Sequence, residues 1–160
     1  MSDDDRVIAD ALGKILSRGF RVGLYADLTD GVARGLNEST YPVFSALVRA
    51  DAPVGARDIA REVGTDRSVV SRRAATLMSA GLVEPVPGAD SRAVYFTLTE
   101  HGRRSAAVMR ERLDAAIARH LAGWSDGDVR RFAALFSKFS AQPLPRGTNG
   151  GLAETRRGEH

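Results

Sequence analysis

The segment Ala56–Arg104 constrains the fold of this chain more than any other part of the sequence. Ala56–Val63 is predicted to form one short helix, which ends at Gly64 because glycine readily adopts the left-handed conformation of a helix terminus. A second helical pattern follows, and either Thr65 or Asp66 can cap it. Two short helices are therefore expected on either side of a tight turn.

A β-hairpin is predicted directly after the second helix, which Gly81 closes. Leu82–Val86 is its first strand, and the alternation across Val94–Leu98 predicts its half-buried second strand. Pro87–Ser91 is left as the exposed tip. Two helices across a turn and then a hairpin are the layout of a winged helix-turn-helix, a mainly α fold with a small β-wing that typically binds DNA.

Basic and hydroxyl side chains are concentrated on the second helix and the hairpin tip. The residues predicted to bind DNA are Arg67, Ser68, Ser71, Arg72, Arg73, Thr76, Asp90 and Arg92. The first four share one face of the N-terminal turns, where a recognition helix contacts base edges, and the next two are expected nearer the phosphates. At the tip, Asp90 can orient Arg92 for a narrow minor groove. The alternative interpretation of the helix residues is a solvated basic face, and that of Asp90 and Arg92 is a weak surface ion pair.

The N-terminal residues predict one long helix. An apolar residue stands at every fourth position from Ile8 to Val32, a period close to that of the α-helix. Because this period drifts around the axis, more than one neighbour is expected to cover the stripe. Gly19 and Gly23 lie inside it, and they are interpreted as places of close backbone approach, as a kink, or as weak points of the helix.

Three further helix starts are predicted. Asn37 or Ser39 can cap a helix, and a start near Ser39 is favoured because Pro42 fits only in a first turn. Thr99 is expected to cap a long helix, and Ser125 a final one.

The final helix carries Phe132, Phe136 and Phe139, which are interpreted as core or dimer contacts. From Gln142 onward proline, glycine and polar residues predict a disordered tail. The expected organisation is an N-terminal dimerisation helix in 1–36, a DNA-binding winged helix-turn-helix in 37–104, C-terminal dimerisation helices in 105–141 and the tail in 142–160.

Composition excludes several other classes of protein. The chain has no cysteine, so disulfides, cysteine-ligated zinc and thiol redox sensing are excluded. Its three histidines are too dispersed for a metal site, and it contains neither a nucleophile elbow nor a phosphate loop, so no enzyme and no cofactor are expected. It has no membrane-length apolar run or secretory leader, which predicts a cytoplasmic protein without a membrane partner. By itself, the net charge of +3 is too small to indicate a nucleic-acid partner, so that inference depends on where the basic residues lie in the chain.

Several of these segments resemble the MarR family of bacterial multiple-antibiotic-resistance type regulators. DRSVVSRRAATLMSAGLVEP, residues 66–85, is similar to the family's recognition helix and its entry into the wing. ADSRAVYFTLTEHGRR, residues 89–104, resembles the wing, with Asp90 and Arg92 at the outer positions of its D-R-R motif. Residues 41–64 match the preceding helices more loosely.

The resemblance implies a triangular homodimer whose terminal helices interleave and whose two winged helices bind a palindromic DNA operator. It also implies a small aromatic effector as a possible partner, for which Tyr25, Tyr41 or Arg21 are candidate contacts without a defined residue set. Two departures remove positive charge near the DNA backbone: Glu84-Pro85 replaces the usual basic residues, and Ser91 replaces the middle arginine of the wing motif.

The favoured function is therefore a sequence-specific transcription regulator, with repression as the expected mode of action. The alternative is a winged-helix module for protein–protein assembly, in which the basic face is only solvated. The two differ in salt dependence, because neutralising phosphates makes DNA binding fall steeply as salt rises.

Overall fold

A computed structural model describes residues 2–50, 52–87 and 94–142 of the 160-residue chain. The elements are α1 (Asp3–Leu16), α2 (Arg18–Thr29), α3 (Tyr41–Ala50), β1 (Val54–Gly55), α4 (Ala56–Val63), α5 (Arg67–Ser79), β2 (Val83–Pro87), β3 (Val94–Leu98), α6 (Glu100–His120) and α7 (Asp126–Ser140). They form two compact units, Met1–Ala118 and Arg119–His160. Within the described ranges, no helix combines the length and the apolar character that a bilayer crossing requires.

The predicted single N-terminal helix is wrong, because the chain forms two helices with a break at Ser17. The backbone of Ser17 is extended, with φ −58° and ψ 146°, and its Oγ accepts a hydrogen bond from the Phe20 amide at 3.3 Å. Ser17 therefore ends α1 and caps α2, while Gly19 and Gly23 both lie inside α2. At the start of α1, Ser2 and Asp5 form a reciprocal capping box, which lowers the pKa of the Asp5 carboxyl through hydrogen bonds from the Ser2 amide and hydroxyl.

The prediction that Asn37 caps the next helix is partly correct. Its Oδ1 accepts from the Ser39 amide at 2.9 Å and from the Thr40 amide at 3.1 Å, but these bonds hold a turn rather than the first helical turn. The helix α3 itself begins at Tyr41, which places Pro42 in its first turn as expected.

The helix-turn-helix follows the predicted boundaries. The helix α4 spans the predicted range and ends at Gly64, whose φ of 70° and ψ of 42° are left-handed. Asp66 is the N-cap residue of α5, although its side chain makes no cap hydrogen bond. Gly81, with φ 71°, redirects the chain from α5 towards β2.

A three-stranded antiparallel sheet with the order β1-β3-β2 forms the stem of the wing. The predicted hairpin is confirmed as β2 and β3, with Val83 opposite Leu98 and Pro87 opposite Val94. The sequence did not predict β1, which places Val54 opposite Phe96 on the other edge of β3. The predicted tip, 87–91, lies outside the described residues from residue 88 onward.

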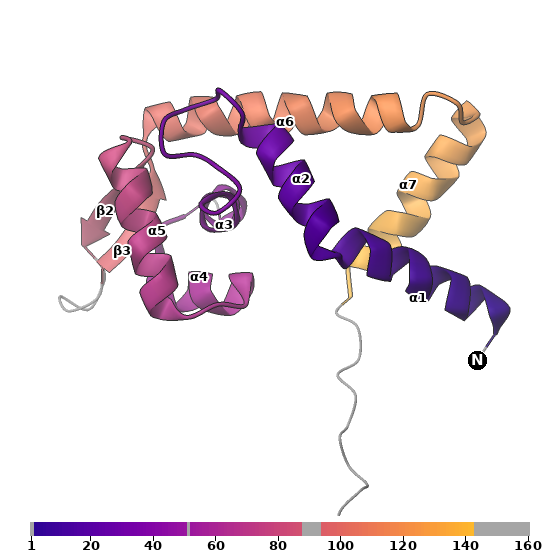
Figure 1. Cartoon of the computed structure of the whole chain (residues 1–160), viewed down its shortest axis with the longest axis horizontal. Coiled ribbons are helices and arrows are strands. Elements are labelled where there is room, and N and C mark those ends of the chain that lie inside the picture. The colour runs from indigo at the N-terminus through magenta and orange to yellow at the C-terminus, as the bar shows by residue number, and fades with distance from the viewer. Residues whose placement is uncertain (1, 51, 88–93, 143–160) are drawn as a thin grey trace, which may run out of the picture. The chain divides into compact units, whose positions relative to one another are not determined.

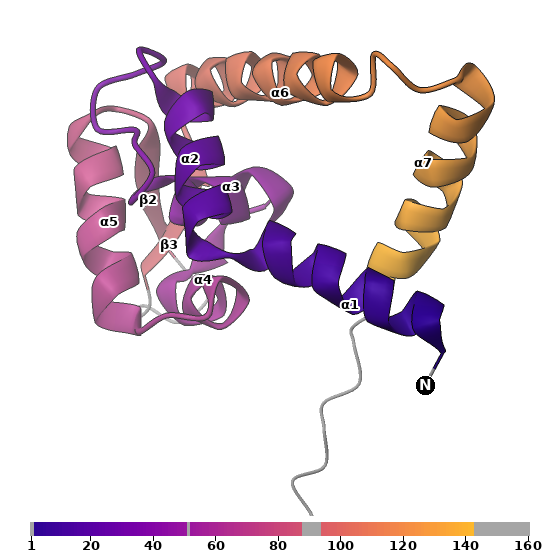
Figure 2. The same cartoon turned by 45° about the vertical axis from the view of Figure 1, so that its right-hand side comes forward.

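The core of the first unit lies where α3, α4 and α5 meet the sheet. Its largest fully buried side chains are Phe44, Ile59, Leu77, Leu82, Val43 and Val70. Figures 1 and 2 show these three helices gathered with β2 and β3 at the beginning of α6. Burial of this apolar face is the main force that holds the recognition helix in place.

Hydrogen bonds at both its start and its middle, among other contacts, join α6 to the rest of the first unit. Thr99 caps α6 as predicted: its Oγ1 accepts from the Gly102 amide at 3.0 Å and donates to the Gly81 carbonyl at 2.6 Å. Further along α6, Arg112 Nη1 donates to the carbonyl oxygens at the end of α2, at 2.6 Å from Asp30 and 3.4 Å from Leu28. A cation at the carboxyl end of a helix also interacts favourably with the helix dipole.

In the second unit, Ser125 caps α7 as predicted, and Ser125 Oγ accepts from the Asp128 amide at 3.2 Å. No residue of α7 is buried. Trp124, Phe132 and Phe136 form a consecutive aromatic row, with ring centroids 5.4 Å apart at each step. The predicted tail lies outside the described residues from residue 143 onward.

Candidate nucleic-acid interface

The outward face of α5 carries the first four predicted DNA-binding residues. Arg67, Ser68, Ser71 and Arg72 are exposed, and they lie on the N-terminal half of the helix. Their direction follows from burial of Val70, Ala74 and Leu77 on the opposite side. Ser71 Oγ donates to the Arg67 carbonyl at 3.0 Å, which leaves its oxygen lone pairs free to accept.

Arg73 and Thr76 are the predicted phosphate contacts, and they lie further along α5. Arg73 is half-buried, whereas Thr76 is exposed and donates from Oγ1 to the Arg72 carbonyl at 3.3 Å. Together with Arg72 they line an open depression of about 360 Å³, whose other wall is the turn before α3. This arrangement brings a second segment of the chain to the recognition helix.

The arginines of α5 carry unneutralised charge. Arg67, Arg72 and Arg73 form no salt bridge with any carboxylate of the residues that the structure describes. By contrast, Arg49 on α3 is held by Glu62 at 2.7 Å, so it is engaged within the fold. The guanidinium groups of α5 are therefore available to an external anion.

A second depression, of about 790 Å³, lies between α4, α5 and β3, and it contains basic residues that the sequence did not suggest. Arg57 and Arg61 of α4 line it beside Arg67, with Tyr95 of β3 on the other side. Arg61 is partly neutralised by Asp58 at 3.2 Å. The signal was present in the sequence, because the inner face of α4 leaves positions 57 and 61 pointing outward.

Only the stem of the wing is described. Asp90 and Arg92, the remaining predicted DNA-binding residues, lie outside the described residues. Within β2, Glu84 and Pro85 are exposed, so this departure from the usual basic pattern lies on the surface of the stem, whereas Ser91 lies outside the described residues.

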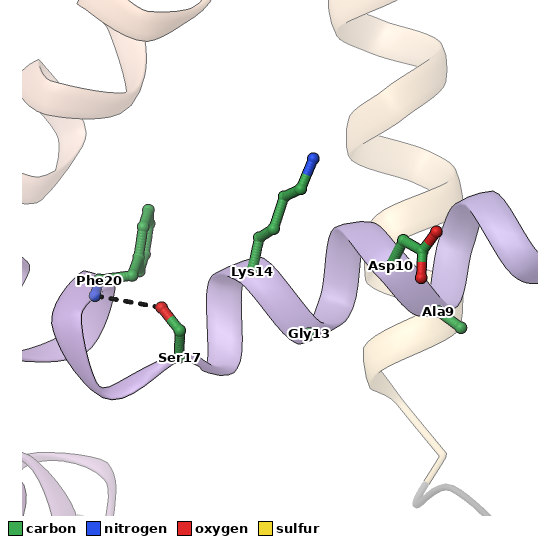
Figure 3. Close-up of a pocket in the computed structure, with 6 residues that line it drawn as sticks. All are labelled: Ala9, Asp10, Gly13, Lys14, Ser17 and Phe20. Atoms are coloured by element: carbon green, nitrogen blue, oxygen red, sulfur yellow. Dashed lines mark hydrogen bonds between the residues drawn. The ribbon is translucent and has the colours of Figure 1, made fainter.

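A third hollow, at the bend between α1 and α2, has a different charge. Figure 3 shows that Asp10 and Lys14 extend from α1 there and that Phe20 stands across the break at Ser17. Its lining contains one cation, Lys14, and one carboxylate, Asp10, so the two formal charges cancel. The hollow therefore lacks the positive charge that a nucleic acid would require.

The three candidate effector contacts lie close together on α2 and α3. The rings of Tyr25 and Tyr41 have centroids 4.5 Å apart and planes inclined by 36°. Arg21 lies one helical turn before Tyr25 on α2 and is exposed. Within the described part of the chain, no group of three metal-binding side chains comes together.

Comparison with known proteins follows this geometry. The family model that matches is the IclR helix-turn-helix domain, over residues 42–87, and no curated protein sequence is similar to the chain. A MarR-family transcriptional regulator from Rhodococcus sp. RHA1 is 26% identical with a TM-score of 0.63, and the alignment covers 83% of this chain and 94% of that one. RV1404 from Mycobacterium tuberculosis is 21% identical with a TM-score of 0.66, over 94% and 97% of the two chains.

CouR from Rhodococcus jostii RHA1, whose structure contains p-coumaroyl-CoA, is 23% identical with a TM-score of 0.60, over 90% and 96% of the two chains. The matched family model extends only from α3 to β2, so it covers the helix-turn-helix and the first strand of the hairpin. The structural similarity extends over the flanking helices as well.

Proposed function

We propose that this chain, a winged helix-turn-helix protein of the MarR type, is a transcription regulator that binds double-stranded DNA as a homodimer. The observation that carries the proposal is the exposed face of α5, where Ser68 and Ser71 stand between Arg67 and Arg72 and neither arginine forms a salt bridge with a described carboxylate. Such a face on the first turns of a recognition helix fits the major groove, where arginine bonds a guanine edge in two places. Arg67 and Arg72 are the proposed base contacts, and Ser68 and Ser71 contact bases or phosphates.

In this proposal the wing contributes through the minor groove. Arg92 would insert there, oriented by Asp90, and would respond to groove width rather than to a donor–acceptor pattern. Arg73 and Thr76 would contact phosphates, which fix the position of the helix but carry no sequence information.

Dimerisation is supported by apolar surface that the chain itself leaves uncovered. The side chains of Val7 and Leu16 in α1 are 67% and 57% exposed, and that of Leu135 in α7 is 59% exposed. Phe20 and the aromatic row from Trp124 to Phe136 add to this surface. A second copy would bury these side chains, and we therefore assign dimerisation to 1–36 and 105–141 and DNA binding to 37–104.

Two-fold symmetry would present two identical recognition helices, so the operator would be an inverted repeat with half-sites about 10 base pairs apart. Repression and release by a small aromatic effector are part of the proposal. The paired rings of Tyr25 and Tyr41 support an aromatic ligand, as does the acyl-CoA found in CouR.

Selection from a random-sequence DNA pool, followed by titration at several salt concentrations, tests this function. The selected sites should be inverted repeats, and affinity should fall steeply with salt. Arg67→Ala or Arg72→Ala should cost about 1–3 kcal/mol per base contact and relax the preference at one position of each half-site. Arg104→Ala removes an exposed arginine in α6, outside the proposed DNA contacts and the segments assigned to dimerisation, and serves as the control. Failure to enrich any sequence, with binding that does not respond to salt, would favour a protein-assembly module instead.

A further inference from the structure

The depression beside Arg73 is built from two segments that are far apart in the sequence. Its lining residues are Asn37, Ser39, Thr40, Val69, Arg72, Arg73 and Thr76. The first three belong to the turn before α3 and the others to α5, so the turn stands against the middle of the recognition helix.

Hydrogen bonds within the turn fix its shape and the direction of its donors. Thr40 Oγ1 accepts from the Asn37 amide at 3.0 Å and donates to the Gly35 carbonyl at 2.8 Å. Asn37 Oδ1 accepts two backbone amides, so the NH₂ group of the same side chain is left as a donor. Ser39 is exposed, and its hydroxyl has no hydrogen-bond partner among the described residues.

The lining presents hydrogen-bond donors and positive charge, without a carboxylate. Arg72 and Arg73 contribute two guanidinium groups that no described carboxylate neutralises, and Ser39 and Asn37 contribute neutral donors from across the depression. Guanidinium and hydroxyl donors that converge from two sides suit a tetrahedral oxyanion of low charge. Arg73 lies one residue beyond Arg72, about 100° around the helix, so one helix can serve both a base edge and this depression.

We propose that this depression is a clamp for one DNA backbone phosphate, in which Ser39 and Asn37 bind the phosphate from the side opposite Arg73. The inference rests on the proposed function and extends it to a second element, the turn 37–40. The clamp sets how deeply and at what angle α5 enters the groove, because a phosphate held between the turn and the helix fixes the distance of both from the duplex. The residues of the turn are positioning residues in this respect, since they do not select bases.

Phosphate contacts do not depend on sequence, so the probe is a labelled mixed-sequence duplex of roughly 30 base pairs, titrated over a series of salt concentrations. Ser39→Ala removes one neutral donor and is expected to weaken binding about three- to tenfold without changing the salt slope. Ser39→Glu places a carboxylate against the phosphate and is expected to weaken binding by more than about tenfold. Arg73→Gln should lower the magnitude of the slope by about 0.9 for each copy that contacts the duplex.

Ala52→Glu is the matched control, because it adds the same charge at an exposed position between α3 and β1, outside the proposed DNA contacts and the segments assigned to dimerisation. Thermal unfolding of each variant checks that the fold is retained. If the wild type binds the duplex and Ser39→Glu and Arg73→Gln bind as tightly as Ala52→Glu, the clamp is refuted while the proposed function stands. A wild type that does not bind any duplex at low salt refutes both.

Inorganic phosphate separates a backbone clamp from a site for a free anion. Suppose that millimolar phosphate raises the unfolding temperature of the wild type but not of Ser39→Glu, while both bind the duplex equally well. The depression would then be a free-anion site, and the clamp would be overturned.

Discussion

Replacing Gly102 with alanine should destabilise the first unit more than any other single added methyl group at a glycine of the described helices. Gly102 is buried in the first turn of α6. A Cβ built there would overlap the carbonyl oxygen of Leu82, and it would lie 3.1 Å from the carbonyl carbon of Leu82 and 3.4 Å from Leu98 Cβ. The obstacle is backbone, which cannot rotate away as a flexible side chain can.

The magnitude follows from the contacts around Leu82. The Leu82 carbonyl accepts from the Thr99 amide at 3.1 Å, and Thr99 Oγ1 donates to the Gly81 carbonyl at 2.6 Å, so moving α6 away disturbs both bonds. Overpacking costs about 1–3 kcal/mol and each hydrogen bond contributes about 1 kcal/mol, against a gain of about 1 kcal/mol from the higher helix propensity of alanine. The net loss in free energy of unfolding is about 2–4 kcal/mol. For a chain of this size, that loss corresponds to roughly 5–15 °C in unfolding temperature.

Thermal unfolding followed by circular dichroism, at a fixed protein concentration, measures this loss. Gly127→Ala in α7 is the matched control, because the nearest atom to its added Cβ is Ser125 Oγ at 3.8 Å, and it should leave the unfolding temperature unchanged or slightly raised. If Gly102→Ala unfolds at the same temperature as Gly127→Ala, Gly102 does not lie as close to the Leu82 carbonyl as described, and the reasoning is refuted.

Four further outcomes are expected. Phe136→Asp should convert the proposed dimer to monomer in sedimentation experiments, because a carboxylate would replace an exposed ring of the aromatic row; a persistent dimer would exclude that row from the interface. Arg112→Met should lower the free energy of unfolding by about 1–3 kcal/mol, because the carbonyl oxygens at the end of α2 lose a charged donor; an unchanged unfolding curve would argue against that contact. Mild peroxide should leave DNA binding intact, since the chain has no thiol, Met109 is buried and Met78 is half-buried; rapid release that thiols reverse would contradict this. The pKa of the Asp5 carboxyl is lowered in the folded chain, so the capping box stabilises α1 fully at a pH above the ordinary carboxyl pKa, and this stabilisation is lost as the pH falls through the folded-state pKa. An acid titration followed by NMR should show the first turn of α1 fraying over that pH range in the wild type, whereas Asp5→Asn, which has no carboxyl at this position, should show no such Asp5-dependent step.

Local chemistry made much of the fold predictable. Gly64 and Gly81 end their helices with positive φ, and a glycine after an apolar helical pattern predicts such an end from neighbouring residues alone. Ser125 and Thr99 are likewise caps that local sequence suffices to identify. The exposure of Arg67 and Arg72 could also be predicted locally, because the spacing of the apolar residues in this helix fixes which face is buried and which is exposed.

The features that sequence missed depend on partners far along the chain. The strand β1 has two residues and exists only because β3 pairs with it, about 40 residues later. The break at Ser17 was missed because the four-residue apolar period continues across it without interruption. The turn at Asn37 joins the candidate interface through tertiary packing, which periodicity within one helix cannot predict, whereas the outward position of Arg57 follows from the period of α4.

The position of β3 in the middle of its sheet makes the wing a separable part of the protein. Because β1 holds one edge of β3 and β2 holds the other, the register of the stem is set on both sides, with Phe96 opposite both Val54 and Pro85. A strand held in this way resists the one-residue slip that would exchange its buried and exposed faces. The segment that joins Pro87 to Val94 can therefore be shortened, lengthened or replaced while the stem and α5 keep their places. Under the proposed function, preference for the flanks of a DNA site and preference for its centre would then change independently, by exchange of the tip in one case and by substitution on α5 in the other.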